Sequence, residues 1–412
     1  MTANGETTST IRVAPLALYE GDRLNRLLGR IGLGPRRPKH LLWRSVLLLS
    51  VTWLPMALLA TWEGLYRGLA NNFFADFAAY AQFFIGLPLF VIAEAVVIRA
   101  TGEAGIEFAT AGVLRHPAKL LQLDELHRDV SRLKNAAWID VACVLMAFNL
   151  SGWIVGAELL RHGPLENWHT AWRDSSTRAL TVTGWWAFGV AIPLLNYWWL
   201  RHVARIFIWT HYLYRVSRLR LDLLATHPDR TGGIGFISDV QGHFAWVIFA
   251  YGLTNVAAPV GYELAVLGVD LWIPPVWGPL LGFIIGAPLL FTLPLFLFTR
   301  RLAITKMLAR RRYRRLLTGQ TRRMESKVMP LQAQRRVTPE VADFGVVTQL
   351  SQLFERIEAM RVVPFDFRSL LQLLTSSLGS VVTVLPLLHV EGSIGRILEA
   401  LVKILERLPF AH

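Results

Sequence analysis

The sequence contains a single cysteine, Cys143, in 412 residues. One thiol cannot form an intrachain disulfide, a multi-thiolate metal cluster or a cysteine-pair redox centre, so these kinds of site are excluded. Familiar catalytic patterns are also missing: there is no Walker phosphate loop, no zinc-protease helix and no recognisable Ser-His-Asp order. These absences argue against the classical enzyme classes, and the sequence assigns no catalytic residue and no cofactor.

Charged residues are scarce as well. They make up 17% of the chain, whereas hydrophobic residues make up 53%. A water-soluble domain of this length cannot bury so much apolar surface in a single core, so lipid is the expected solvent for much of the chain. The composition therefore predicts an integral membrane protein.

Six apolar stretches are each long enough to cross a bilayer, whose hydrocarbon core of about 30 Å requires about 20 helical residues. They cover residues 42–62, 77–97, 136–159, 180–200, 244–267 and 276–299. Each is expected to be helical because hydrocarbon offers no hydrogen-bond partner to an open sheet edge, and because a β-barrel would show short alternating segments instead. The predicted fold is an all-α, polytopic transmembrane helix bundle.

The net charge of +14 is distributed unevenly along the chain. Lys and Arg concentrate before the first span, in the connections 99–135 and 201–241, and after residue 300. The only Lys or Arg residues in the three intervening connections are Arg67, Arg161, Arg173 and Arg178. Because cytoplasmic loops carry the excess of basic residues, we expect a multi-pass protein of the inner membrane with both termini in the cytoplasm.

This distribution divides the chain into a basic leader (1–41), a transmembrane domain (42–300) and a basic, amphipathic tail (301–412). Pro35 and Pro38 discourage a continuous helix from the leader into the membrane, so the leader is expected to be loosely ordered. In the connection 99–135, a cytoplasmic amphipathic helix is expected to begin near Pro117.

The tail carries a basic patch that is expected to bind anionic lipid headgroups rather than nucleic acid. The patch consists of Arg310, Arg311, Arg312, Arg314 and Arg315. The apolar segment 370–390 is interrupted by serines, a glycine and Pro386, which favours a docked or re-entrant segment over a seventh crossing, although both remain open. The apolar face of the last helix suggests a homo-oligomer.

The most specific string in the chain reads His-Pro-Asp-Arg-Thr-Gly-Gly-Ile-Gly-Phe and covers residues 227–236. A glycine-rich turn before a helix can direct several backbone N–H groups at an anion, and an arginine adds a planar fork. This favours an anion or headgroup site formed by His227, Asp229, Arg230, Gly232, Gly233 and Gly235. The alternative is a tight reversal in which the glycines end one helix and Asp229 caps a turn.

The same string resembles the His-Pro-Asp-Arg-Ala-Gly-Gly-Leu-Gly loop of a group of uncharacterised bacterial polytopic inner-membrane proteins. Thr231 and Ile234 are the two departures from that pattern. The resemblance covers one connection of the chain, with a vaguer likeness around residues 385–388. It implies a bacterial inner-membrane protein and implies no activity.

Several ionisable residues fall near the inner ends of the second to fifth spans. Such groups usually face protein or water inside a membrane and often mark an ion or proton path. The alternative for any one of them is a hydrogen bond or ion pair with a neighbouring residue. The predicted cytoplasmic vestibule is lined by Glu94, Asp140, His202, Asp239 and His243.

A metal site in this region is left open by the sequence. Asp239 and His243 are four residues apart and share a helix face, and His227 can approach them from the preceding loop. Two histidines and a carboxylate are a known metal-binding set, but a single such spacing is a weak signal.

These patterns together predict a channel or transporter for a small ion or solute. Two alternatives remain. One is a membrane-embedded enzyme that acts on lipid headgroups through His227, Asp229, Asp239 and His243. The other is a scaffold that binds other proteins through its basic tail.

Overall fold

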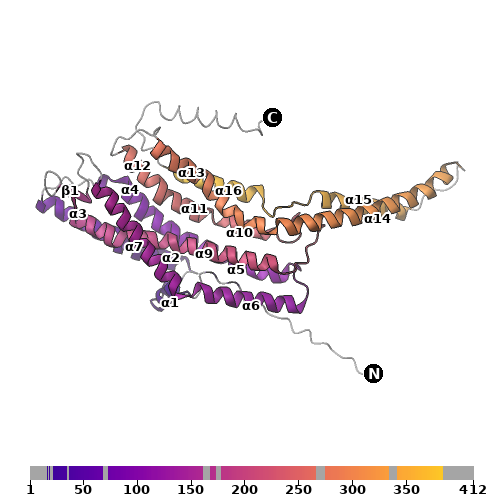
Figure 1. Cartoon of the computed structure of the whole chain (residues 1–412), viewed down its shortest axis with the longest axis horizontal. Coiled ribbons are helices and arrows are strands. Elements are labelled where there is room, and N and C mark those ends of the chain that lie inside the picture. Colours follow the sequence, from indigo (N-terminus) through magenta and orange to yellow (C-terminus); the bar gives the residue numbers. More distant parts are fainter. Residues whose placement is uncertain are drawn as a thin grey trace, which may run out of the picture.

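The computed structural model describes residues 16, 18, 22–34, 37–67, 73–160, 168–172, 178–265, 274–333 and 341–383. In this part of the chain the fold is a bundle of long helices with one two-stranded sheet, which confirms the all-α polytopic fold (Figure 1). Length and composition identify five helices that can cross a membrane. They are Pro38–Leu65, Phe77–Thr110, Ala137–Leu160, Phe236–Leu264 and Val276–Ser326.

The remaining expected span, 180–200, also forms a helix. It consists of α8 (Val182–Trp186), η3 (Ala187–Ala191) and α9 (Ile192–Arg218), and it packs most extensively against α7 (Ala137–Leu160). This helix buries polar groups such as Asn196 and Arg201, so it is less apolar than the other spans. The strands β1 (Thr170–Trp172) and β2 (Arg178–Leu180) pair antiparallel between α7 and α8.

Several spans are built from consecutive helical segments. The first contains α2 (Pro38–Val51) and α3 (Trp53–Arg67), and the second contains η1 (Phe73–Ala75), α4 (Phe77–Ala79), η2 (Tyr80–Gly86) and α5 (Leu87–Thr110). The fifth contains α10 (Phe236–His243), α11 (Ala245–Tyr251), η4 (Gly252–Ala257) and α12 (Ala258–Ala265), and the sixth contains α13 (Pro274–Thr292), η5 (Leu293–Phe298) and α14 (Thr299–Ala333).

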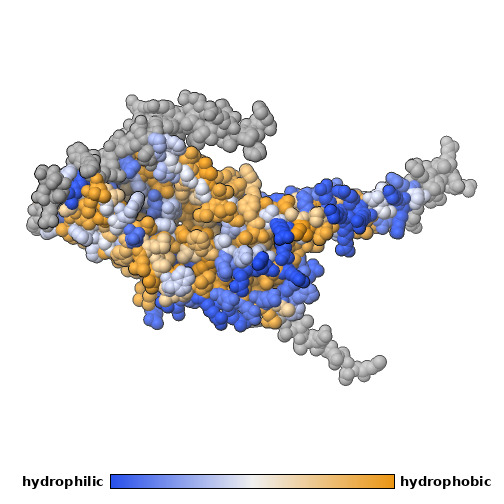
Figure 2. Space-filling model, viewed as in Figure 1, coloured by the Kyte–Doolittle hydropathy of each residue, from blue (hydrophilic) through white to orange (hydrophobic). Residues whose placement is uncertain are grey.

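The outer faces of the bundle are apolar, as expected of a surface in contact with lipid. Large hydrophobic side chains such as Leu58, Trp153 and Ile285 are 63%, 74% and 58% exposed. Figure 2 shows this apolar surface over the bundle and a mostly hydrophilic surface over the helices that project from it. Extended exposed apolar areas of this kind mark membrane contact, so the protein spans a membrane.

The break between α2 and α3 follows from a proline. Pro55 has no N–H group to donate to the carbonyl of Val51, four residues earlier. The indole Nε1 of Trp186, on the fourth span, donates to that carbonyl at 3.1 Å. A side chain from a neighbouring span therefore replaces the missing backbone hydrogen bond.

Three π-helical segments, η2, η3 and η4, interrupt the second, fourth and fifth spans. The wider turn is rare and leaves carbonyl groups without their usual intrahelical donors. Gln82 donates to the carbonyl of Thr254 in η4 at 3.1 Å, and Ser151 donates to that of Phe188 in η3 at 2.6 Å. Contacts between neighbouring spans therefore maintain this irregular backbone.

One end of the bundle is formed by the segments near residues 99–134 and 201–235. It is the basic end of the molecule. The helix α6 (Pro117–Lys134) begins at the expected Pro117 and packs along α9. Trp209 and Tyr212, on α9, and Phe108, on α5, are fully buried, and His127 Nε2, on α6, lies 3.0 Å from the Tyr212 hydroxyl. The packing at the basic end is continuous with the core of the spans, because the same buried cluster also contains Ala93 on α5 and Ala147 on α7.

The leader is ordered over residues 22–34, contrary to expectation. It forms α1 (Arg23–Arg30), capped by Asp22, whose carboxylate accepts a hydrogen bond from the Asn25 N–H at 2.9 Å. Asp22 and Asn25 are only 2% and 5% exposed because they bind charged groups of the bundle, a tertiary contact that local sequence does not reveal.

The described part of the tail contains three helices, two of which pack against each other while the third packs against the bundle. The helix α14 continues the sixth span away from the body, and α15 (Val341–Glu358) lies alongside it (Figure 1). The helix α16 (Phe367–Val382) packs against α11 and α13, burying Ser377 and Ser380. Residues 370–382 of the segment 370–390 therefore pack along two membrane-crossing helices, and residues 384–390 lie outside the described residues.

Candidate functional site

Two carboxylates are buried where the leader meets the second and fourth spans. Glu94, on α5, is 0% exposed and Asp22 is 2% exposed. Arg201, on α9, donates through Nη1 to Glu94 Oε2 at 2.7 Å and through Nη2 to Asp22 Oδ2 at 2.6 Å. One guanidinium group therefore bridges two buried carboxylates, using the planar geometry that arginine offers to such groups.

Arg205 extends this network by one helical turn. Its Nη2 donates to Asp22 Oδ2 at 2.9 Å, and its Nη1 donates to the carbonyl of Lys134, at the end of α6, at 2.9 Å. The same guanidinium thus joins the leader, the fourth span and the connection before the third span. The spacing of Arg201 and Arg205 places both on one face of α9.

Arg44 joins the network from the first span. Its Nη2 donates to Asn25 Oδ1 at 2.9 Å and lies 3.6 Å from Glu94 Oε2. Asn25 in turn donates to Glu94 Oε1 at 2.6 Å. The ring of Trp198 lies against both Arg44 and Arg201, whose guanidinium carbons are 5.6 Å and 5.5 Å from its centroid. Cation–π contact compensates part of the cost of burying these charges.

The arginine network, defined as Asp22, Asn25, Arg44, Glu94, Arg201 and Arg205, contains three guanidinium groups and two carboxylates. Arg44 is 1% exposed, and its Nε and Nη1 atoms have no hydrogen-bond partner among the described residues. Burying charged donors without acceptors is costly, and such atoms commonly mark the place of a water molecule or an ion. The network therefore has an excess of positive charge and donor capacity to spare.

The first three predicted vestibule residues lie in or near this network. Glu94 belongs to it, and His202 is fully buried with Nε2 3.2 Å from the carbonyl of Phe90. Asp140, on α7, acts electrostatically on Cys143 and Tyr197, and its Oδ2 atom is buried without a hydrogen-bond partner among the described residues.

Asp239 and His243 lie elsewhere, on the exposed face of α10, with His243 Nδ1 2.7 Å from the Asp239 carbonyl. Asp239 interacts electrostatically with Glu107 on α5. Glu107 is thirteen residues beyond Glu94 and therefore about 20 Å from Glu94 along the helix axis. The five predicted vestibule residues thus form two separate groups rather than one layer. Hydropathy alone misplaced them because α5 and α10 both continue past the apolar windows at the basic end.

The open question of a metal site is answered for the described residues. Among them, no group of three or more His, Cys, Asp or Glu side chains is placed to hold a metal ion. His227 instead places Nδ1 2.8 Å from Asp229 Oδ1.

The loop 227–236 is organised around its own aspartate. The carboxylate of Asp229 accepts hydrogen bonds from the backbone N–H groups of Thr231, Gly233 and Gly235 at 2.8, 2.9 and 2.9 Å. Burial alone would raise the pKa of Asp229, but these hydrogen bonds and that of His227 outweigh it and hold the pKa below its usual value.

The backbone of this loop accounts for its glycines. Gly232 and Gly233 have φ angles of 73° and 95°, in the region that glycine adopts without strain. A Cβ atom at position 235 would lie 2.9 Å from Thr231 Oγ1. The N–H groups expected to face an external anion therefore face Asp229, which caps the turn as in the tight-turn alternative. The glycines end no helix, however, because α9 ends at Arg218.

The loop also contacts the tail. The Arg361 N–H donates to the carbonyl of Arg230 at 2.7 Å. A cavity of about 650 Å³ lies between the loop and α15, lined by His227, Pro228, Arg230, Gln352, Glu355, Arg356 and Ala359. Of the predicted loop residues, His227 and Arg230 thus face a second space that is separate from the arginine network.

Comparison of the chain with protein-family models, curated proteins and solved structures finds no match. The functional argument therefore rests on the residues themselves.

The basic patch, Arg310 to Arg315, lies on the projecting part of α14, and its five arginines are exposed. Arg310 is twelve residues beyond Phe298, or about 18 Å along the helix. Binding of this patch to lipid headgroups remains a prediction.

Sequence reasoning missed most of the arginine network, namely Asp22, Asn25, Arg44, Arg201 and Arg205. One signal was present: Arg44 lies inside the first apolar window, and an ionisable residue in a membrane segment is a functional candidate by default. Counting these arginines only as evidence for topology concealed their second role. No local pattern indicated Asp22, whose partners are distant in sequence.

Proposed function

We propose that this protein is a multi-pass transporter of the bacterial inner membrane, with its basic end in the cytoplasm, that carries a small anionic solute. The observation that supports this most strongly is the arginine network. It buries three guanidinium groups against two carboxylates and leaves two donors of Arg44 without a partner among the described residues. A small anion with carboxylate-like or phosphate-like oxygens is the ligand that such a site favours.

Transport through this site requires rearrangement rather than an open pore. Asp22, Arg44, Glu94, Arg201 and Arg205 are between 0% and 2% exposed, so the site is closed in this conformation. An anion that binds the arginines would compete with Glu94 and Asp22 for the same donors and so loosen the contact between the leader and the spans. The π-helical turns in the second, fourth and fifth spans provide places where these helices can bend.

Flux through proteoliposomes tests this proposal. The purified protein is reconstituted, and uptake of radiolabelled phosphate, chloride and acetate is compared with uptake of rubidium and with protein-free liposomes. We expect the wild type to accumulate at least one of the anions. Arg44→Gln removes the spare donors but leaves the contacts of Arg201 with Glu94 and Asp22, and should reduce uptake about tenfold.

Arg132→Gln provides the matched control, because the Arg132 side chain is 82% exposed on α6. Its uptake should equal that of the wild type. The proposal is rejected if no anion enters faster than into protein-free liposomes, or if Arg44→Gln transports as rapidly as the wild type while eluting as the same monodisperse species.

A second candidate function, a scaffold, is favoured by one observation: the hairpin of α14 and α15 projects from the body and carries exposed arginines (Figure 2). Replacing residues 311–356 with a short Gly-Ser linker separates the two functions. A transporter should retain uptake, whereas a scaffold should lose its protein partners in crosslinking experiments in cells.

Assembly into a homo-oligomer also remains a proposal.

A further inference from the structure

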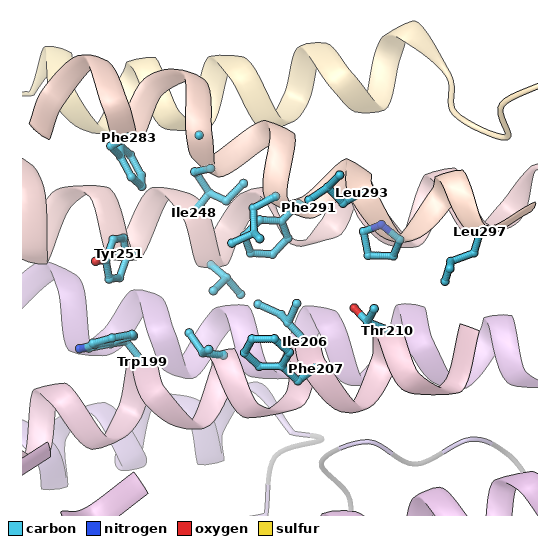
Figure 3. A pocket seen from close by; sticks show the side chains of 16 residues that line it. Trp199, Ile206, Phe207, Thr210, Ile248, Tyr251, Phe283, Phe291, Leu293 and Leu297 are labelled. Carbon is cyan, nitrogen blue, oxygen red and sulfur yellow. The ribbon is translucent and has the colours of Figure 1, made fainter. Parts of the chain in front are cut away.

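An apolar groove of about 560 Å³ lies between α9, α11, α13 and η5. Its volume is within the range of small-molecule sites, about 300 to 1,000 Å³. Trp199, Tyr251 and Phe283 lie at one end, and Thr210 and Leu297 lie at the other (Figure 3). The lining side chains are almost entirely apolar, so the groove is suited to a hydrocarbon chain.

The groove is at the depth of the membrane hydrocarbon. Phe207, Leu290 and Leu293 contribute to its lining and are 68%, 57% and 52% exposed on the outer surface of the bundle. Large apolar side chains exposed together on helices long enough to cross a membrane are expected where the surface contacts lipid. The open side of the groove therefore faces the acyl chains of the bilayer.

Basic residues lie just beyond the inner end of the groove. Arg300 and Arg301 follow Leu297 by one helical turn, about 5 Å. On α9, Tyr214 follows Thr210 by one turn, and the guanidinium carbon of Arg218 lies 5.5 Å from the centre of the Tyr214 ring. These residues are exposed or half-buried and are at the level where headgroups begin.

The charge around this end is predominantly positive. The sequence contains no acidic residue in 182–221 or in 276–324, the segments that form α9, α13, η5 and most of α14. On the third side of the groove, α10 presents His243 one turn before Val247 and Asp239 one turn before His243. Asp239 thus contributes a carboxylate at this end, and Asp366 and Glu107 are close enough to interact with it. The helices α9 and α14 bring only basic charged groups to this end among the described residues, namely Arg218, Arg300 and Arg301.

We propose that this groove is a binding site for an anionic membrane phospholipid. One acyl chain occupies the groove, and the phosphate group binds Arg300 and Arg301. The apolar lining explains the position of the chain, and the basic end explains the preference for an anionic headgroup. This site is separate from the arginine network, and it can exist whether or not the protein transports a solute.

Filling the groove tests the position of the acyl chain. A Cβ atom at Gly286, which lines the groove, would meet no atom within 4 Å, so Gly286→Leu should occupy the space without displacing a neighbour. Gly282, on the same helix, is equally open but does not line the groove, so Gly282→Leu is the matched control. Native mass spectrometry of protein from nanodiscs of phosphatidylglycerol and phosphatidylcholine in equal parts measures the retained lipid.

We expect wild type and Gly282→Leu to retain phosphatidylglycerol in preference to phosphatidylcholine, and Gly286→Leu to retain at least fivefold less. Arg300→Gln with Arg301→Gln should abolish the preference for phosphatidylglycerol, whereas Arg322→Gln with Arg323→Gln, at exposed positions farther along α14 and outside the basic patch, should preserve it.

Three results would overturn the proposal. The wild type could retain both lipids equally, Gly286→Leu could retain as much lipid as the wild type, or Gly286→Leu could separate a dimer with no change in bound lipid. The last result would identify the groove as an interface between copies of this chain. None of these measurements depends on solute uptake, so the lipid site and the transport proposal fail independently.

Discussion

At the scale of single residues, Arg201 is the centre of the molecule's buried electrostatics. Its guanidinium group binds Glu94 and Asp22 at once, and each carboxylate has further donors, from Asn25 and from Arg205. A buried ion pair contributes little net stability compared with apolar packing, but the loss of one partner leaves a charge without compensation. The network therefore makes the fold dependent on several charges at the same time.

This dependence leads to a prediction for Arg201→Met. The substitution leaves Glu94 and Asp22 buried beside fewer positive charges, and we expect it to lower the stability of the folded state by about 3–5 kcal/mol. Adding Glu94→Gln to the same protein should recover part of this loss, because one uncompensated charge is removed. Thermal unfolding of the detergent-solubilised protein measures both effects, and simple additivity of the two substitutions would contradict direct pairing.

Asp229 leads to a prediction with a pH dependence. Its pKa is below the usual value in the folded protein, so its stabilising contribution is complete above the unfolded pKa of about 3.9 and is lost as the pH falls through the lower, folded pKa. Asp229→Asn should cost about 1–3 kcal/mol near neutral pH, because its amide cannot accept all three backbone hydrogen bonds.

The measurement is unfolding as a function of pH. The difference between wild type and Asp229→Asn should be constant above about pH 5 and should shrink in more acidic solution, as protonation removes the carboxylate from the wild type. A difference that grows as the pH falls would have the wrong sign and would exclude this role for Asp229.

At the scale of helical elements, close approaches between spans determine which residues are tolerated. Gly86, at the end of η2, faces Thr254 in η4, and a Cβ atom at position 86 would lie 1.9 Å from Thr254 Cγ2. Gln82, on the same segment, donates to the Thr254 carbonyl. The two π-helical segments thus require both a small residue and a specific polar contact where they meet.

Gly86→Ala should therefore destabilise the protein by about 1–3 kcal/mol through overpacking. Thr254→Ser removes the methyl group that would clash and keeps the hydroxyl, so the double variant Gly86→Ala with Thr254→Ser should regain much of the loss. Unfolding temperatures of the two single variants and the double variant provide the test. No recovery in the double variant would show that the contact between these segments is wrong.

At the scale of the whole molecule, one lysine joins the two helices of the projecting hairpin. Lys306, on α14, donates through Nζ to the carbonyls of Glu358 and Met360 at 2.8 and 2.7 Å, at the C-terminal end of α15. Lys306→Met should remove both hydrogen bonds and increase hydrogen exchange in residues 355–361 at least tenfold. Exchange in α13 should remain unchanged, and protection of 355–361 equal to that of the wild type would contradict this arrangement.

The candidate site was only partly predictable from the sequence. Glu94 and His202 were identified from their position in apolar spans, and they are indeed buried at the basic end. Asp239 and His243 were grouped with them because both lie near the start of an apolar window, yet α10 places them about 20 Å further along α5. Hydropathy gives approximate depth in the membrane but does not determine which helix faces meet.

The sequence by itself determined that the chain crosses a membrane as helices, because the length of an apolar run and the need to satisfy backbone hydrogen bonds in lipid are local properties. It also contained the turn 227–235, whose glycines and aspartate interact within a few residues. Only the tertiary structure decided that Asp22, Arg44, Glu94 and Arg201 meet, since these residues come from segments as much as 179 positions apart. Their contact depends on how the helices pack, and no local pattern encodes that packing.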